Sequence, residues 1–135
     1  MEIDLDALNA RISGLPAYLG IRFVEATRDR LIAELTITDN LKTRGGRPHG
    51  GTLMALADTV GAVATTINLP PNTWTTTLES KTNFIAAGRG DVVRAEATPL
   101  HRGRTTQVWQ TRVTDMTGRL ISQTIQTQMV LPNPA

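Results

Sequence analysis

The sequence predicts an α+β fold in which one antiparallel sheet of five or six strands curls around one long central helix, and three observations lead to this class. Residues from about 50 to 68 are proline-free, rich in alanine and apolar around most of a helical cylinder, the pattern of a buried helix. The flanking segments alternate between apolar and polar residues with the period of β-strands. Short glycine-containing connections join the later strands, and such a sheet buries a helix only by curling around it.

The other elements follow from the same patterns. Leu5, Leu8 and Ile12 have helical spacing in a short N-terminal helix over residues 4–13, which Gly14 and Pro16 end. Residues 18–40 alternate and form a hairpin around a polar turn at 27–30. Four further strands are expected, at about 74–84, 91–101, 105–114 and 120–130. Their glycine-containing connections predict that consecutive strands are antiparallel neighbours.

Composition limits the class of protein. The 135 residues are enough for one domain, 1–135, and the content of 40% hydrophobic and 19% charged residues is typical of a soluble globular chain. We find no apolar run of membrane-spanning length, and the acidic N-terminus is unlike a signal peptide, so we expect a cytoplasmic protein. The net charge of +2 is too mild to indicate nucleic-acid binding.

The scarcity of metal-binding side chains excludes several kinds of site. The chain has no cysteine, so disulfides, thiolate zinc sites and cysteine nucleophiles are excluded. The two histidines lie far apart in sequence and do not have the spacing of common metal ligands. We therefore expect no metal.

The single charge inside the long helix is Asp58. Burying a bare carboxylate costs far more than the stability margin of one domain, so the group needs hydrogen-bond partners or a changed pKa. Asp58 is therefore either a structural cap or bridge, or a group that takes part in chemistry.

The spacing of His49 and Asp58 bears on that choice. Nine residues separate them, which at about 100° and 1.5 Å per residue puts them on opposite sides of the helix and roughly 13 Å apart along it. Within one chain they cannot meet. Either they are unrelated, or two antiparallel copies of the helix bring His49 of one chain to Asp58 of the other across a two-fold axis. We adopt the second interpretation, which predicts a homodimer with paired sites.

Several motifs, in order, carry a resemblance to a known family. His49-Gly50-Gly51 open the long helix, Asp58 lies inside it, and residues 77–84, 101–104 and 118–120 complete the pattern. Over roughly residues 19–131 the chain resembles the hotdog fold of acyl-CoA thioesterases. It looks most like the PaaI-like branch, which includes phenylacetyl-CoA thioesterases and the second type of 4-hydroxybenzoyl-CoA thioesterases.

The resemblance implies roles for individual residues. The thioester carbonyl would lie at the start of the long helix, where the first-turn amides of Gly50 and Gly51 lack intrahelical acceptors and suit a developing oxyanion. Asp58, reached from the neighbouring subunit, would act as nucleophile or as general base on water. A strand hydroxyl would assist it, assigned to Thr77 with Thr76 as the slipped alternative.

Other positions are less well defined by the resemblance. Many members carry Asn or Gln six residues before the histidine, whereas this chain has Thr43 there, with Asn40 as the nearby amide. Either residue serves, or the group is absent. Arg89, Arg102 and Arg104 at predicted turns suit the phosphates of coenzyme A, or are solvated loop charges.

The first functional hypothesis is an acyl-CoA thioesterase that needs no metal or redox cofactor and acts as a homodimer, with dimers pairing into a homotetramer. The alternatives are a hotdog enoyl-CoA hydratase or dehydratase, and a non-catalytic acyl-CoA binding module. The acyl group is left open, because the aliphatic candidates for its pocket do not separate an aryl from an alkyl chain. Those candidates are Leu53, Met54, Val60 and Trp74.

Overall fold

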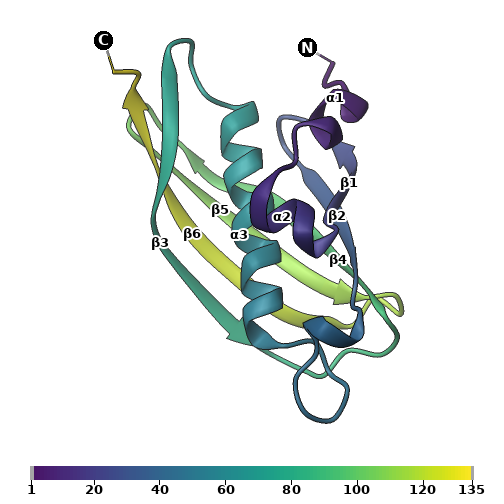
Figure 1. The fold of residues 1–135 in the computed structure, drawn as a ribbon. Helices are drawn as coiled ribbons and strands as arrows, with labels where there is room; N and C mark the ends of the chain where they lie inside the picture. The colour runs from purple at the N-terminus through teal and green to yellow at the C-terminus, as the bar shows by residue number, and fades with distance from the viewer. Residues whose placement is uncertain (1, 135) are drawn as a thin grey trace.

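A computed structural model describes residues 2–134. Six strands form one antiparallel sheet in the order β1-β2-β4-β5-β6-β3, and the long helix α3 lies in the concave face of the curled sheet (Figure 1). This confirms the predicted α+β class. The elements are α1 Leu5–Ala10, α2 Gly14–Leu19, β1 Arg22–Ala26, β2 Leu31–Thr36, the 3-10 helix η1 Asp39–Leu41, α3 Gly50–Ile67, β3 Thr73–Phe84, β4 Val92–Arg102, β5 Thr106–Asp115 and β6 Leu120–Pro132.

The long helix is the centre of the core. Its residues Leu53, Leu56, Val60 and Ala64 are buried together with apolar side chains of the sheet. By length and composition α3 is the one helix within residues 2–134 that could cross a bilayer, so the expectation of no such apolar run is wrong on those two measures. Its packing against the sheet identifies it as a core helix.

The N-terminal region differs from the prediction. Instead of one helix over 4–13, α1 ends at Ala10, and a second helix, α2, runs from Gly14 to Leu19. Pro16 was expected to end a helix, but it lies in the first turn of α2, where its missing N–H has no intrahelical acceptor. Gly20, with φ of +86°, closes α2 in the left-handed conformation.

The position of β3 also differs from the prediction. The hairpins β1–β2, β4–β5 and β5–β6 are antiparallel neighbours as expected, but β3 pairs with β6 and β4 pairs with β2. The connection 85–91 is therefore not a hairpin turn. It crosses beneath the start of α3, and the N–H groups of Ile85 and Ala86 donate to the carbonyl of Ile121.

β3 forms one outer edge of the sheet. This twelve-residue strand pairs only with β6, so its other side is open within the protomer. Three large apolar side chains of this strand are exposed, namely Trp74, Leu78 and Phe84. A long, unpaired and partly apolar edge is unusual in a protein that acts as a monomer.

Candidate functional site

His49 is the N-cap of α3. Its side-chain Nδ1 accepts a hydrogen bond from the backbone N–H of Gly51 at 2.8 Å. Because Nδ1 is the acceptor, the neutral imidazole carries its proton on Nε2. The exposed His49 therefore presents an N–H donor to the surroundings of the helix start.

The two glycines that follow have different roles. The Gly51 N–H is engaged by His49, and a Cβ at Gly51 would lie 3.0 Å from Nδ1 of that ring. Among residues 2–134 the N–H of Gly50 has no acceptor. A Cβ at Gly50 would lie 3.1 Å from the ring of Phe84, so a side chain there would crowd the aromatic wall. Of the two predicted oxyanion donors, Gly50 alone is free in the protomer.

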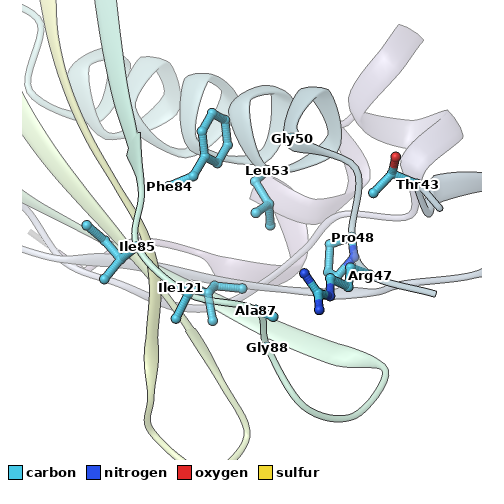
Figure 2. Close-up of a pocket in the computed structure, with 11 residues that line it drawn as sticks. Thr43, Arg47, Pro48, Gly50, Leu53, Phe84, Ile85, Ala87, Gly88 and Ile121 are labelled. Carbon is cyan, nitrogen blue, oxygen red and sulfur yellow. The ribbon is translucent and has the colours of Figure 1, made fainter. Parts of the chain in front are cut away.

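A cavity of about 330 Å³ opens beside Gly50 (Figure 2). Leu53 of α3, Phe84 at the end of β3, and Ile121 of β6 give it apolar walls. Of the four side chains expected around the acyl group, Leu53 lines this cavity, and Met54, Val60 and Trp74 do not. The remaining lining residues are Thr43, Arg47, Pro48, Ile85, Ala86, Ala87 and Gly88.

Asp115 fixes the loop that forms one wall of the cavity. Its carboxylate accepts from the hydroxyl of Thr117 at 2.6 Å and from the backbone N–H groups of Arg89, Thr117 and Arg119 at 2.9–3.1 Å. These bonds, led by the Thr117 hydroxyl, lower the pKa of Asp115 to about 2. Asp115 is not among the site residues expected from the sequence. The signal for its structural role is an Asp that opens a glycine-containing turn.

Asp58 lies in the middle of α3, on the surface of the protomer. Helix and strand atoms exclude part of the water around its carboxyl, and this desolvation raises its pKa. A hydrogen bond from the Thr77 side chain acts in the opposite direction. Of the two threonines considered, it is therefore Thr77 that faces Asp58, whereas the adjacent Thr76 lies on the other face of β3.

The structure does not bring Asp58 to the cavity within one chain. Asp58 is not among the residues that line the space beside Gly50. The groups that shift the pKa of Asp58 do not include His49. One chain thus holds two separate polar groups: the donors of His49 and Gly50 at the start of α3, and the Asp58 carboxylate with Thr77 farther along the helix.

Thr43 and Asn40 lie in different surroundings, and one of them lines the cavity. Thr43 lies in the tight loop before α3, where its N–H donates to the carbonyl of Arg47 at 2.8 Å, and it lines the cavity. The Asn40 side chain instead bonds the hydroxyl of Thr38 and does not line the cavity. Thr43 is therefore the one of the two that adjoins Gly50.

The three candidate arginines lie at two ends of the protomer. Arg89 follows Gly88 in the cavity loop and is exposed. Arg102 lies at the other end of α3, where it forms an ion pair with Asp29 at 2.8 Å and donates to the carbonyl of Arg28. Arg104 lies in the turn after β4, beside Arg102. Of these three, Arg89 is the closest in sequence to the cavity lining, and Arg47, which the sequence analysis did not single out, lines the cavity itself.

The comparisons with known proteins bear on this arrangement. A family model described as the thioesterase superfamily matches residues 45–122, from the loop before α3 into β6. The chain belongs to the thioesterase superfamily. The 1,4-dihydroxy-2-naphthoyl-CoA hydrolase of Escherichia coli is 34% identical to this thioesterase over 131 residues, 96% of each chain. A proofreading thioesterase of Klebsiella pneumoniae is 32% identical over 119 residues, 87% of each chain. This thioesterase is accordingly a thioester hydrolase.

Solved structures agree with the fold. A thioesterase of Haemophilus influenzae superposes with a TM-score of 0.92 at 28% identity, covering 98% of this chain and 93% of that one. A mutant thioesterase of Pseudomonas aeruginosa superposes with a TM-score of 0.91 at 29% identity, covering 98% and 96%. The expected hotdog fold is thereby confirmed for this thioesterase.

Proposed function

We propose that this thioesterase hydrolyses acyl-CoA thioesters to coenzyme A and a free carboxylic acid, at a site completed by two protomers. The observation that carries the proposal is the separation of the two halves of the site. The free Gly50 N–H borders an apolar cavity, while the partly desolvated Asp58 carboxylate lies elsewhere in the same chain. The naphthoyl-CoA hydrolase among the relatives supports coenzyme A as the thiol.

The open edge of β3 supports a second protomer as the missing half. Two such edges can pair antiparallel across a two-fold axis, which continues the sheet and covers exposed Trp74 and Leu78. The two α3 helices then also run antiparallel. This arrangement brings the His49 end of one helix toward the middle of the other, where Asp58 lies.

The chemistry follows from the groups that would meet. The thioester carbonyl oxygen would accept from the Gly50 N–H at the positive end of α3, so the negative charge that develops on this oxygen is stabilised. The Nε2–H of His49 is a second donor at the same helix end. Glycine at position 50 leaves room for the reacting carbon, and the cavity receives the acyl group, since its volume lies at the lower end of the range for small-molecule pockets.

Asp58 from the partner protomer would then activate the attack. As a general base it takes a proton from water, the oxygen adds to the thioester carbon, and the tetrahedral intermediate expels the thiolate of coenzyme A, which takes up the proton. As a nucleophile it attacks the thioester carbon and expels the thiolate of coenzyme A, which takes up a proton, and water then hydrolyses the resulting anhydride to the free acid and the Asp58 carboxylate. Both routes need the ionised carboxylate. Because desolvation raises the pKa of Asp58, activity should decline on acidification at a higher pH than for an ordinary aspartate.

A complementation experiment tests the shared site. The variants Asp58→Asn and His49→Ala should each release almost no thiol from a panel of aryl-, short- and medium-chain acyl-CoA substrates. When equal amounts are dissociated and reassembled together, half of the dimers are mixed and each has one intact site, so about a quarter of the wild-type activity should return. No recovery in mixtures shown by sedimentation to exchange subunits would refute the shared site. The same sedimentation run tests whether dimers pair into tetramers.

The wild-type protein supplies the test of the activity itself. Thiol release from any member of the panel, lost in Asp58→Asn, is the expected result. Thermal stabilisation by acyl-CoA with no thiol release would instead identify a binding module.

A further inference from the structure

We propose that Gln128 is a positioning residue for the thioesterase reaction, because its buried amide holds the Thr77 hydroxyl so that the hydroxyl proton points to the Asp58 carboxylate. The inference rests on the proposed function, in which Asp58 activates the attack on the thioester. Gln128 does not touch the reacting atoms; it acts through Thr77.

The contacts of Gln128 fix both ends of its amide. The side chain is fully buried on β6, under α3 and opposite Thr77 of β3. Its Oε1 accepts from the hydroxyl of Thr75 at 3.0 Å, and its Nε2 donates to Oγ1 of Thr77 at 2.8 Å. In this orientation the carbonyl end of the amide faces Thr75, which donates its hydroxyl proton, and the NH₂ end faces Thr77.

The direction of the Thr77 hydroxyl follows from this bond. A hydroxyl has one proton to donate and lone pairs that accept. Since Nε2 of Gln128 occupies a lone pair of Thr77, the Thr77 proton is left for another acceptor. Asp58 lies beside this face of β6, because the amide of Gln126, two residues before Gln128, contacts the Asp58 backbone carbonyl. We infer that the Asp58 carboxylate is the acceptor, and the Thr77 hydrogen bond lowers the pKa of Asp58 against the effect of desolvation. The ionised carboxylate is thereby favoured.

The backbone of β3 supports this geometry. Thr77 pairs with Gln128, but the register then shifts, so that Glu79 pairs with Thr127 and Leu78 has no partner on β6. Bulges of this kind change the direction of side chains and are common beside active sites. Here the regular alternation that places Thr75 and Thr77 on the Gln128 face ends directly after Thr77.

A second glutamine holds the other side of the same residue. Gln126, two residues before Gln128 on β6, directs its Nε2 to the backbone carbonyl of Asp58 at 3.5 Å. The helix can approach this amide closely only because position 61 is glycine: a Cβ there would lie 2.2 Å from Oε1 of Gln126. The β6 glutamines thus contact the backbone of Asp58 directly and its side chain through Thr77.

Among the described residues, no charged side chain shifts the pKa of Asp58. The only groups that shift the pKa of Asp58 are the surrounding atoms that desolvate it and Thr77. β6 carries no charged side chain. The titratable side chains on the other elements packed against α3 are Tyr18 on α2, Glu34 on β2, Glu79 and Lys81 on β3, Arg94, Glu96, His101 and Arg102 on β4, and Arg112 and Asp115 on β5.

The variant Gln128→Met tests the inference, because methionine keeps the shape of glutamine without its hydrogen bonds. We expect kcat to fall about 10-fold, the loss that corresponds to one hydrogen bond to a charged group, with KM little changed. The acid limb of the pH profile of kcat should move to higher pH, because the carboxylate loses the donor that favours its ionised form. Thr77→Val should show both changes. Thr77→Ser keeps the hydroxyl, so its kcat and acid limb should stay close to those of the wild type.

Thr82→Val is the matched control. Thr82 is on the same strand, and its hydroxyl bonds that of Thr124 on β6 at 2.7 Å, so the variant removes another β3–β6 side-chain bond without touching Thr77. Its acid limb should stay at the wild-type position. If Gln128→Met fails to fold, Thr75→Val is the milder test: it frees the amide to turn its oxygen to Thr77, and the acid limb should move in the same direction.

A titration separates this inference from the proposed function. The carboxyl-carbon NMR signal of Asp58 reports its ionisation without turnover. A titration that moves to higher pH in Gln128→Met supports the positioning role even if no thioester tested is hydrolysed. An Asp58 titration unchanged in both Gln128→Met and Thr75→Val would overturn the positioning role, whereas an inactive wild-type enzyme would refute only the proposed function.

Discussion

The two ends of α3 contrast in what their polar groups do. At the C-terminal end, the Asn68 side chain donates to the carbonyls of Arg28 and Ala64, and Arg102 bonds Asp29 and Asn68. At the N-terminal end, the Gly50 N–H has no acceptor within residues 2–134 and borders a cavity. The satisfied end joins the helix to the β1–β2 turn, whereas the open end offers donors to a ligand.

The difference teaches that helix polarity alone does not make a site. The N-terminus of α3 carries the positive end of the helix dipole, but the N-terminus of every α-helix does so. Here His49 takes one amide as its cap and leaves the next donor free, and Phe84 closes the space above that donor with an aromatic wall. The following substitutions, taken from the largest expected effect to the smallest, test the contrast.

At the open end, His49→Ala and His49→Asn should separate capping from catalysis. Asparagine is a good N-cap, so the Asn variant should keep wild-type stability, while alanine should lower the free energy of unfolding by about 0.5–2 kcal/mol. Both should lose about 10²–10³-fold in kcat, because each lacks the imidazole donor. Thiol release and chemical denaturation measure the two effects. An Asn variant with wild-type kcat would remove His49 from the reaction.

At the satisfied end, Asn68→Ala should affect stability and leave chemistry alone. The variant removes the amide that donates to the Arg28 and Ala64 carbonyls and accepts from Arg102, which should lower the free energy of unfolding by about 1–3 kcal/mol. The value of kcat/KM should change less than about 2-fold. Thr66→Ala is the control, because its hydroxyl bonds only the Ala62 carbonyl of its own helix. A large drop in kcat would show that this end also serves the reaction.

Asp115→Asn should loosen the wall of the cavity in a pH-dependent way. The pKa of Asp115 is about 2 in the folded state, below the ordinary value of about 4 in the unfolded chain. The ionised carboxylate therefore stabilises the fold fully above about pH 4, and this contribution is lost as the pH falls toward 2. The variant should melt several degrees lower at neutral pH, with a difference that shrinks near pH 2. Thermal unfolding at both pH values measures it. A difference that persists near pH 2 would contradict the role of the charge.

Replacing the arginines at the two ends of α3 should give the smallest of these effects, a measurable change in KM. Arg89→Ala, at the cavity loop, should raise KM several-fold for acyl-CoA substrates, as expected for one exposed contact to a phosphate. It should leave unchanged the KM for the same acyl group on N-acetylcysteamine, which lacks the nucleotide. Arg102→Ala should show a smaller rise because its guanidinium is already held by Asp29. An equal rise for both would place the nucleotide near both ends.

Local pattern predicted most of the fold. The apolar cylinder of α3 and the alternation of β4, β5 and β6 extend over whole elements, and the structure confirms them within a few residues. The place of β3 could not be predicted, because strand pairing is set by distant residues, and the loop 85–91 has the glycines of a hairpin without being one. The helix α2 was missed because a proline in the first turn was interpreted as a stop.

The site was predicted unevenly. The helix-start residues and Asp58 have recognisable types and spacing. Gln128 offers no such signal, because a glutamine in an alternating strand normally suggests a solvent-exposed position, and only the packing of α3 on β6 reveals that it is buried. Asp115 likewise gains its role from a loop distant in sequence.

The bare edge of β3 has a consequence for handling the protein. The open side of β3 and its protruding apolar side chains make a lone chain prone to self-association, and the proposed homodimer would be subject to mass action. Melting temperature and specific activity should both rise with protein concentration, and dilute stocks should lose activity that concentrating them restores. A fused tandem repeat of the chain would free the enzyme from that dependence.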